Sequence, residues 1–333
     1  MSAKPHLIKP VFDGKRFSYP DNTPQGSRWD VLRWALTRKP ARWPKDLQNP
    51  VADPVVSEVS GENLRITFIN HATVLIQCNS INVITDPVFS KRVSPVKFAG
   101  PARHRAAGLT VSQLPQIHAV LISHTHYDHL DTRSIATICE RDNPLIVAPL
   151  NNARAINKAT ACHVAELSWW EQQTIGESIQ VALVPARHWT SRMPGDENKA
   201  LWGGFVLKFP GAPVYFAGDT GYGDGRHFTQ AREQYGRFRC ALLPIGAYQP
   251  RWFMKPQHMN PAEAVRAFRD LQATYALGIH HGTFQLTDEP YDAPLKDLEI
   301  ALANQSVNPQ QFRTLDNGRA WNIPALSDNT FSE

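Results

Sequence analysis

Short apolar runs separated by turn residues begin at Leu64 and recur along the rest of the chain. Apolar runs of about four to eight residues bounded by turns are typical of buried strands. The runs predict strands at residues 64–70, 72–78, 81–85, 117–123, 145–148, 179–185, 204–209, 214–217, 240–244 and 275–279.

Helical spacing of apolar residues appears between several of these strands and once before them. Residues 132–140 follow Asp131, a suitable N-cap, and residues 261–271 carry Pro261 in the first turn. A third helix is predicted at 295–304, and a fourth at 28–39, where Pro40 ends the pattern. Strands followed by alternating helices and strands, in two halves, indicate a layered α/β protein with helices outside packed sheets.

The first 60 residues differ from the rest because they are rich in proline and mostly irregular. We therefore divide the chain into an N-terminal extension, residues 1–60, and one domain, residues 61–333. The full chain has 333 residues, of which 42% are hydrophobic, and this is enough apolar surface for a large core. Its Gly and Pro residues follow no period, which argues against collagen, a coiled coil and disorder.

Location is indicated by the apolar segments and the cysteines. No apolar run approaches the roughly 18–20 residues that cross a bilayer, and the N-terminus has no secretory signal pattern. The cysteines are far apart and form no CxxC pair, which fits buried thiols in a reducing compartment (Cys78, Cys139, Cys162 and Cys240). We expect a cytoplasmic protein; whether it forms a homo-oligomer is left open.

Positive charge is concentrated at the N-terminus. The chain has a net charge of +5, whereas residues 1–50 contain ten basic and four acidic residues, a net charge of +6. Such a segment favours contact with an anionic partner, although a solvated arm is the alternative. Within it, Trp29, Leu32 and Leu36 form an apolar stripe beside basic residues, so residues 28–39 either dock on an anionic membrane or pack on the domain. The chain has no other basic, aromatic-rich arm, so we expect no nucleic-acid partner.

The strongest chemical signal directly follows the predicted strand 117–123. His124, His126, Asp128 and His129 lie within six residues, and so many polar groups cannot serve as core filling. Imidazole nitrogens and carboxylate oxygens together suit zinc, and iron or manganese less often. Four ligands so close in sequence do not fit one ion, so we assign His124 and His126 to one metal and Asp128 and His129 to another.

Each of these two metals needs further ligands, and later strand ends supply candidates. His188 follows strand 179–185, Asp219 follows strand 214–217, and His280 and His281 follow strand 275–279. Strand ends on one edge of a layered α/β protein are where a site assembles. Asp86, at the end of another strand, is expected to orient ligands by hydrogen bonding rather than to bind metal.

The motif from His124 to Asp131 resembles the HxHxDH signature of the metallo-β-lactamase superfamily, which implies a four-layer αββα sandwich. Six stretches resemble more narrowly the N-acyl-phosphatidylethanolamine-hydrolysing phospholipase D family: residues 70–73, 85–90, 121–131, 169–171, 217–221 and 244–255. By that resemblance, one zinc is bound by His124, His126 and His188. The other is bound by Asp128, His129 and His280, and Asp219 bridges the two.

The chain departs from this family at several positions. Asn70 replaces a usual glycine, and His281 stands where the mammalian enzymes carry tryptophan. Lys97 and Phe98 stand where those enzymes have glutamine and tyrosine, and residues 1–60 match poorly.

Two neighbouring metal ions can lower the pKa of a shared water towards neutrality, and such a centre can attack either carbonyl carbon or phosphorus. We assign catalytic roles to Asp128 and Asp219 and expect the substrate to contact Lys97, Trp189, Tyr248, Arg251 and His281. The resemblance implies a zinc-dependent phosphodiesterase that cleaves N-acyl-phosphatidylethanolamine to phosphatidate and an N-acylethanolamine. A lactonase or other small-ester hydrolase is the first alternative, and a metal-binding protein without turnover is the second.

Overall fold

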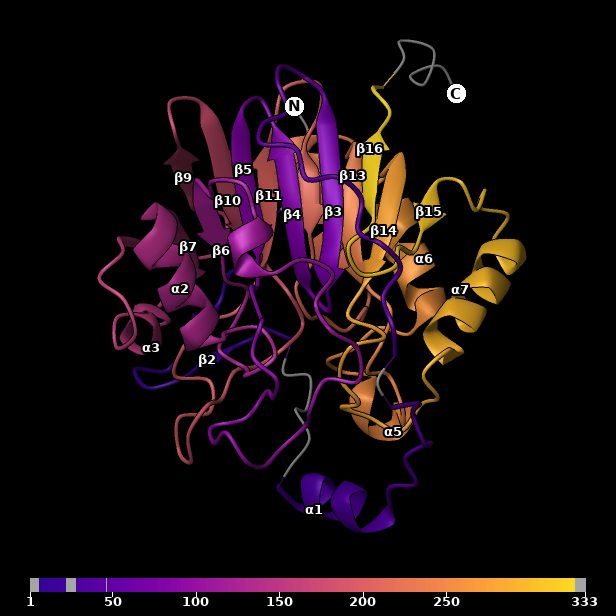
Figure 1. Ribbon diagram of the computed structural model, residues 1–333. Coiled ribbons are helices and arrows are strands. Elements are labelled where there is room, and N and C mark those ends of the chain that lie inside the picture. Colours follow the sequence, from indigo (N-terminus) through magenta and orange to yellow (C-terminus); the bar gives the residue numbers. More distant parts are fainter. Residues whose placement is uncertain (1–5, 22–27, 46, 327–333) are drawn as a thin grey trace.

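The computed structural model describes residues 6–21, 28–45 and 47–326 (Figure 1). Two seven-stranded sheets pack face to face. In spatial order, the first sheet contains β16 (Ala320–Ile323), β3 (Leu64–Asn70), β4 (Thr73–Cys78), β5 (Ile81–Thr85), β6 (Ala119–Leu121), β7 (Leu145–Pro149) and β8 (Val164–Leu167).

The second sheet is built from the later part of the chain. In spatial order it contains β15 (Phe312–Arg313), β14 (Tyr275–Ile279), β13 (Cys240–Pro244), β12 (Val214–Phe216), β11 (Gly204–Lys208), β10 (Ile179–Val184) and β9 (Gln172–Ile175). In both sheets, antiparallel pairs at one side give way to parallel pairs at the other, as in β5–β6–β7 and β12–β13–β14.

Helices cover the outer face of each sheet. The first sheet is covered by α2 (Thr132–Asp142) and α3 (Ala153–Ile156), with a short 3-10 turn at Val111–Gln113. The second is covered by α4 (Arg226–Tyr235), α6 (Pro261–Asp270) and α7 (Ala293–Asn304). Three separate groups of buried apolar side chains fill the three interfaces between these layers. The order helix, sheet, sheet, helix confirms the predicted αββα sandwich.

The sequence pattern located most of these elements. Strands predicted at 64–70, 81–85, 240–244 and 275–279 have the observed bounds, and the others differ by a few residues at their ends. The predicted strand 117–123 shortens to β6, and the predicted N-cap of α2 is confirmed because the Asp131 carboxylate accepts a hydrogen bond from Arg133 N. The four cysteines are buried and free, as the sequence indicates.

The described part of the N-terminal segment lies on the sandwich. It forms a small hairpin, β1 (Val11–Phe12) with β2 (Phe17–Ser18), and it buries Ile8, Phe17 and Tyr19 against the core between the sheets. Trp170 Nε1 donates a hydrogen bond of 2.6 Å to the carbonyl of Ile8. These contacts attach residues 6–21 to the domain.

The predicted N-terminal helix is present as α1 (Arg28–Thr37) and lies next to the short helix α5 (Arg251–Met254). Trp34 stacks on Phe253 with ring centroids 5.4 Å apart, and the Arg33 guanidinium lies 4.8 Å from the centre of the Trp252 ring. The helix therefore packs on the domain through Trp34, whereas Trp29 and Leu36 of the predicted stripe remain 78% and 77% exposed.

No helix in the described part of the chain is long and apolar enough to cross a membrane.

The carboxyl ends of β3, β5, β6, β10, β12 and β14 all face one edge of the sandwich, the lower edge in Figure 1, and α1 and α5 lie on the same side. The segments that follow these strands carry the candidate metal ligands.

Candidate metal centre

All seven candidate ligands meet at this edge, and both sheets contribute. His124, His126, Asp128 and His129 follow β6, whereas His188, Asp219 and His280 follow β10, β12 and β14 of the other sheet. The side chains form two groups whose nitrogen and oxygen atoms lie within metal-binding reach of one another.

The first group contains His124, His126 and His188. His126 Nδ1 lies 2.9 Å from His124 Nε2 and 3.2 Å from His188 Nε2. The second ring nitrogen of His188 is held by the Gln257 carbonyl at 3.1 Å, which turns Nε2 towards the other two imidazoles. Three imidazole nitrogens that converge in this way match three ligands of one transition-metal ion.

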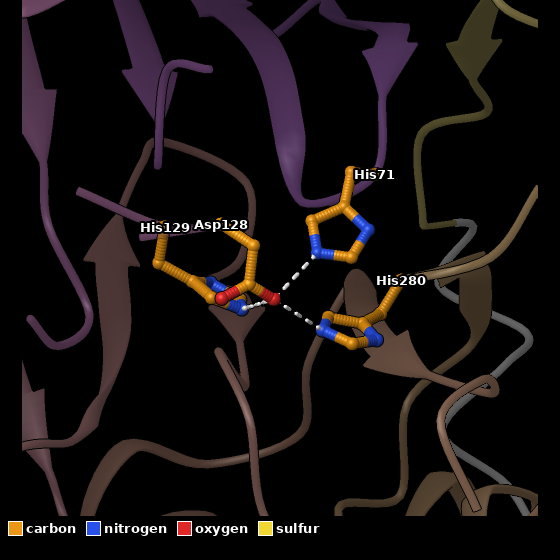
Figure 2. A group of neighbouring side chains, drawn as sticks. All are labelled: His71, Asp128, His129 and His280. Carbon is orange, nitrogen blue, oxygen red and sulfur yellow. Dashed lines mark hydrogen bonds and ion pairs between the residues drawn. The ribbon is translucent and has the colours of Figure 1, made fainter. Parts of the chain in front are cut away.

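The second group surrounds the carboxylate of Asp128 (Figure 2). Asp128 Oδ2 lies 3.4 Å from the Nε2 atoms of both His129 and His280, and 3.0 Å from Nε2 of His71. His71 comes from the turn between β3 and β4, so a fourth side chain joins the three that the sequence assigned to this group.

Asp219 lies between the two groups. Its Oδ2 atom is 3.1 Å from His129 Nε2 and 3.2 Å from His280 Nε2 of the second group, and 3.8 Å from His188 Nε2 of the first. Its other oxygen, Oδ1, makes no hydrogen bond with any described residue although it is buried. Asp219 therefore has one oxygen close to both groups and a second oxygen that is not engaged by the described residues, so its carboxylate is available to an ion in either group.

Gly218 gives the chain the turn that places Asp219. Its φ is +59°, and a Cβ atom there would lie 2.7 Å from the Cβ of Ser123. Only glycine fits this left-handed conformation and this close contact between the two sheets. His71, Asp86 and His280 also have positive φ values, of 47°, 33° and 61°, so three residues of the site adopt a backbone conformation that non-glycine residues rarely take.

Asp86 orients His129, in agreement with the sequence analysis. Its Oδ2 atom lies 2.7 Å from His129 Nδ1 and accepts a hydrogen bond from Ser123 Oγ, while Oδ1 accepts one from Ser123 N at 2.7 Å. The carboxylate thereby leaves His129 Nε2 directed at Asp128 and Asp219. A carboxylate behind a ligand histidine fixes its tautomer and increases its basicity.

Electrostatics at the site favour neutral imidazoles in the first group and ionised carboxylates beside it. Burial lowers the pKa of His126 to about 4 and holds the pKa values of His124 and His188 well below the usual range. Burial opposes ionisation of Asp219, but His129 and His280 outweigh it and keep the Asp219 pKa well below its usual value. Neutral imidazoles and ionised carboxylates are the forms that bind metal.

The donor set therefore fits metal ions on chemical grounds. The neutral imidazoles of the first group bring nitrogen atoms to within 2.9 and 3.2 Å of one another with no cation between them, and His280 Nδ1 and Asp219 Oδ1 find no hydrogen-bond partner among the described residues. A cation in each group would relieve both penalties.

Sequence reasoning missed two histidines at the site. His71 faces Asp128, and His258 lies with Asp219 and His188 in a further group of possible ligands, its Nδ1 atom 3.9 Å from Asp219 Oδ2. His71 also follows a strand, so the strand-end rule that found His188 could have found it. His258 follows a short helix and carries no comparable local signal.

The expected substrate contacts divide into two sets. Trp189 packs edge-on against His126 at 4.6 Å between ring centres, so it lies beside the candidate ligands. Lys97 is exposed and lines a pocket next to the segment after β6 that carries four of the candidate ligands.

The other three expected contacts are engaged with the protein, and their positions give no support to a substrate role. Tyr248 is buried and donates a hydrogen bond to Asp297, and Arg251 forms an ion pair of 2.7 Å with Glu263. His281 stacks on Phe68 at 5.5 Å between ring centres.

Comparison with known proteins identifies the family of the chain. The family described as the beta-lactamase superfamily domain matches residues 81–281. The chain is 36% identical over 287 residues to an N-acyl-phosphatidylethanolamine-hydrolyzing phospholipase D of Caenorhabditis elegans, covering 83% of this chain and 79% of that protein. It is 37% identical over 227 residues to a mitochondrial protein of the same name from Saccharomyces cerevisiae, covering 67% of this chain but only 48% of the yeast protein.

Solved structures with the same fold include an isothiocyanate hydrolase from Delia radicum gut bacteria, with a TM-score of 0.61, 16% identity, and coverage of 79% of this chain and 100% of that one. A possible metal-dependent hydrolase from Veillonella parvula has a TM-score of 0.62 and 18% identity, covering 78% of this chain and 100% of that one. Fold, donor groups and relatives agree, and the chain is a hydrolase of the beta-lactamase superfamily, in one family with the N-acyl-phosphatidylethanolamine-hydrolysing phospholipase D proteins.

Proposed function

We propose that this protein is a two-zinc phosphodiesterase that hydrolyses N-acyl-phosphatidylethanolamine to phosphatidate and an N-acylethanolamine. The observation that carries the proposal is the identity of 36% to the Caenorhabditis elegans phospholipase D, which extends over 83% of the chain. The two donor groups that share Asp219 support a centre for two ions, and their nitrogen-rich composition favours zinc over magnesium or calcium.

In this reaction, the bond between phosphorus and the ethanolamine oxygen breaks. Water supplies a hydroxyl group to phosphorus and a proton to the departing alcohol. Metal ions at the centre would supply Lewis acidity and an activated water. In this proposal, His124, His126 and His188 would hold one ion, Asp128, His129 and His280 would hold the other, and Asp219 would contribute to both sites.

Residues near the centre have supporting roles in the proposal. His71 holds Asp128 in place through the contact of 3.0 Å, and Asp86 fixes the tautomer of His129. Trp189 forms part of the substrate wall next to His126, and Lys97 is placed to attract an anionic substrate.

A lactonase or small-ester hydrolase is the competing function, because the same centre can attack carbonyl carbon. The experiment is a side-by-side assay of N-acyl-phosphatidylethanolamine, a neutral phosphate-free ester and a lactone on protein of measured metal content. We expect about two zinc ions per chain and turnover of the phosphodiester in preference to the other substrates. Preference for the lactone or ester would contradict the proposed substrate.

Asp219→Ala tests the shared centre in the same assay. Loss of the bridge should abolish turnover and reduce the metal content below two ions per chain. Near-normal activity of this variant would overturn the two-metal mechanism, whichever substrate is preferred.

We also propose that the protein works in the cytoplasm as a peripheral membrane protein and meets its lipid through α1. Trp29, Leu32 and Leu36 are at least 47% exposed, and α1 lies on the same side of the molecule as the metal centre (Figure 1). Exposed tryptophan and leucine beside basic residues suit the headgroup region of an anionic bilayer.

A further inference from the structure

A pocket of about 360 Å³ lies next to the segment after β6 that carries four of the candidate ligands. Its walls come from the segment 90–97 after β5, from Tyr127, from residues 130–133, and from Arg192 and Met193. Tyr127 stands between the candidate ligands His126 and Asp128 in the sequence, so the pocket lies next to the segment that carries four of the candidate ligands. We call it the basic pocket.

Five cationic side chains line the basic pocket, and they come from three separate segments of the chain: Lys91, Arg92, Lys97, Arg133 and Arg192. The lining contains one acidic residue, Asp131. Its carboxylate is already used, because it accepts hydrogen bonds from Ser90 N, Arg133 N and Ser134 Oγ. The cations therefore outnumber the single engaged carboxylate by four charges.

None of the five cations forms an ion pair with a described carboxylate, and three of them also lack a side-chain hydrogen bond. For Lys91, Lys97 and Arg133, no described carboxylate lies within 4.0 Å, and no described group forms a side-chain hydrogen bond with them. Arg92 donates one hydrogen bond of 2.5 Å, to the carbonyl of Gly100. An exposed lysine alone would be an ordinary solvated side chain, but here several cations converge on one concavity and repel one another.

Arg192 is the most informative member because it is partly buried. It donates hydrogen bonds to the carbonyls of Thr125 and Leu130, at 2.9 and 2.7 Å, and its guanidinium lies 4.1 Å from the centre of the Tyr127 ring. Burial lowers its pKa, and the described residues place no carboxylate within ion-pair distance. An anion bound in the pocket would stabilise this guanidinium, because the guanidinium is partly removed from water and lies near other cations.

We propose that the basic pocket binds a phosphate monoester. Arginine and lysine are the residues that bind phosphate oxygens, arginine through paired N–H donors and lysine through a point charge. A monoester carries about −1.5 to −2 charges at pH 7, whereas a phosphodiester carries one, so the excess of four positive charges favours the monoester.

The monoester is also the group that the proposed reaction creates. This link rests on the proposed function: cleavage of a phosphodiester in the manner of a phospholipase D leaves phosphatidate, whose phosphate has gained a charge. The basic pocket then acts as a site next to the metal centre that captures the product, or a second phosphatidate of the membrane. A free phosphate ester from solution presents the same chemical group.

The test is direct binding to the metal-loaded protein, measured by calorimetry with two probes. One probe is sn-glycerol 3-phosphate, and the other is vesicles of phosphatidylcholine with 20% phosphatidate, compared with phosphatidylcholine alone. The pocket variant is Lys91→Gln with Arg133→Gln, which removes two cations outside the metal centre. The matched control is Arg154→Gln with Lys158→Gln, which removes one arginine and one lysine that are equally exposed but lie outside the pocket.

We expect the wild-type protein and the control to bind at least one probe, and the pocket variant to bind it about tenfold or more weakly with unchanged metal content. Binding of both probes supports the pocket and shows that the phosphate group suffices. Binding of vesicles alone assigns the lipid source, and binding of glycerol 3-phosphate alone assigns the soluble source.

Binding of neither probe, or equal affinity of the pocket variant and the control, would overturn the proposal. So would binding that is lost on chelation of the metals but indifferent to the pocket variant, because the phosphate would then sit on the metals. The measurement needs no turnover, so it is independent of the outcome of the substrate assay. A lactone-selective enzyme could still bind phosphate here, and a phosphodiesterase could fail to do so.

Discussion

Asp86 is the single side chain on which the geometry of His129 depends. It is completely buried, and it accepts hydrogen bonds from Ser123 while its Oδ2 faces His129 Nδ1 at 2.7 Å. With Asp86 ionised, His129 Nδ1 carries the proton and Nε2 is left with its lone pair, which a metal ion requires.

We predict that Asp86→Asn weakens metal binding by about 10- to 100-fold, because an amide nitrogen facing Nδ1 would place the proton on Nε2 instead. Competition with a chromophoric chelator measures the affinity. Asp53→Asn, which alters a carboxylate that pairs with Arg319, is the control and should leave it unchanged. Equal affinity in Asp86→Asn would show that the carboxylate does not set the tautomer.

His227 offers a separate residue-scale prediction on pH. It is completely buried in α4, and burial lowers its pKa to about 3. Between that value and the unfolded pKa of about 6.5, only the unfolded state binds the proton, so stability is full above pH 6.5 and falls as the pH falls. From pH 7.5 to pH 5, His227 alone should cost about 2 kcal/mol of unfolding free energy.

Urea unfolding at the two pH values measures this cost. His227→Gln keeps a polar partner for Thr220 but cannot titrate, so its loss on acidification should be smaller than that of the wild-type protein by about that amount. The same pH dependence in both proteins would assign the loss to other groups.

The positions of histidines and aspartates at strand ends gave the candidates, with His280 and His281 as alternatives, and the family resemblance selected seven ligands; the structure places these seven within reach of one another. This works because strand ends on one edge of a sandwich must meet, whatever the intervening loops do. His258 could not be found in this way. It reaches Asp219 only because α5 and the turn after it fold back over the edge of the second sheet, a placement with no local signature.

At the scale of elements, strands rich in apolar residues were predictable from the sequence. Elements with few apolar residues, and a strand whose pairing partner is far away in the sequence, were not. The strands β3, β5, β13 and β14 are buried along almost their whole length; β13 and β14 read as nearly continuous apolar segments, and apolar residues make up most of β3 and β5. The half-exposed strand β9 and the polar helix α4 were missed, because each carries few apolar residues. The edge strand β16 was also missed, since its partner β3 lies at the other end of the domain sequence.

The helix α1 shows how an element can be predicted while its packing is not. The spacing of Trp29, Leu32 and Leu36 indicated one apolar face, yet Trp34 makes the contact with Phe253. Arg38 adds an ion pair of 3.1 Å with Asp288. One side of α1 is thus attached to the domain. The predicted stripe remains exposed and is available for contact with another surface.

We predict that Trp29→Ser with Leu36→Ser weakens binding to anionic vesicles by about tenfold or more, since each large apolar side chain contributes up to about 1.5–3 kcal/mol on full burial. Co-sedimentation measures binding, and binding of the wild-type protein should also fall with added salt. Ile300→Ser, which replaces a residue of α7 that is 58% exposed, is the control. If vesicle binding changes neither with added salt nor in the double variant, α1 has no role in membrane binding.

At the scale of the whole molecule, the candidate ligands join the two sheets. His124, His126, Asp128 and His129 come from the first sheet, and the remaining three come from the second. Metal ions held by both sets would resist separation of the sheets, and binding to the folded state alone stabilises it.

Chelation should therefore lower the urea midpoint of unfolding, and added zinc should restore it. With free zinc about 100- to 1,000-fold above its dissociation constant, the loss should be about 3–4 kcal/mol. Fluorescence of the tryptophans can follow unfolding, with metal content measured in parallel. An unchanged midpoint in verified metal-free protein would mean that the ions contribute nothing to holding the sheets together.

The strand β16 has a consequence for the order in which the protein can be made. Arg65 in β3 donates a hydrogen bond of 3.0 Å to Asn322 in β16, a residue 257 positions later. During synthesis, the edge of the first sheet at β3 therefore stays open until β16 has left the ribosome. Open strand edges pair readily with other chains, so the nascent protein is exposed to misassembly until β16 pairs with β3.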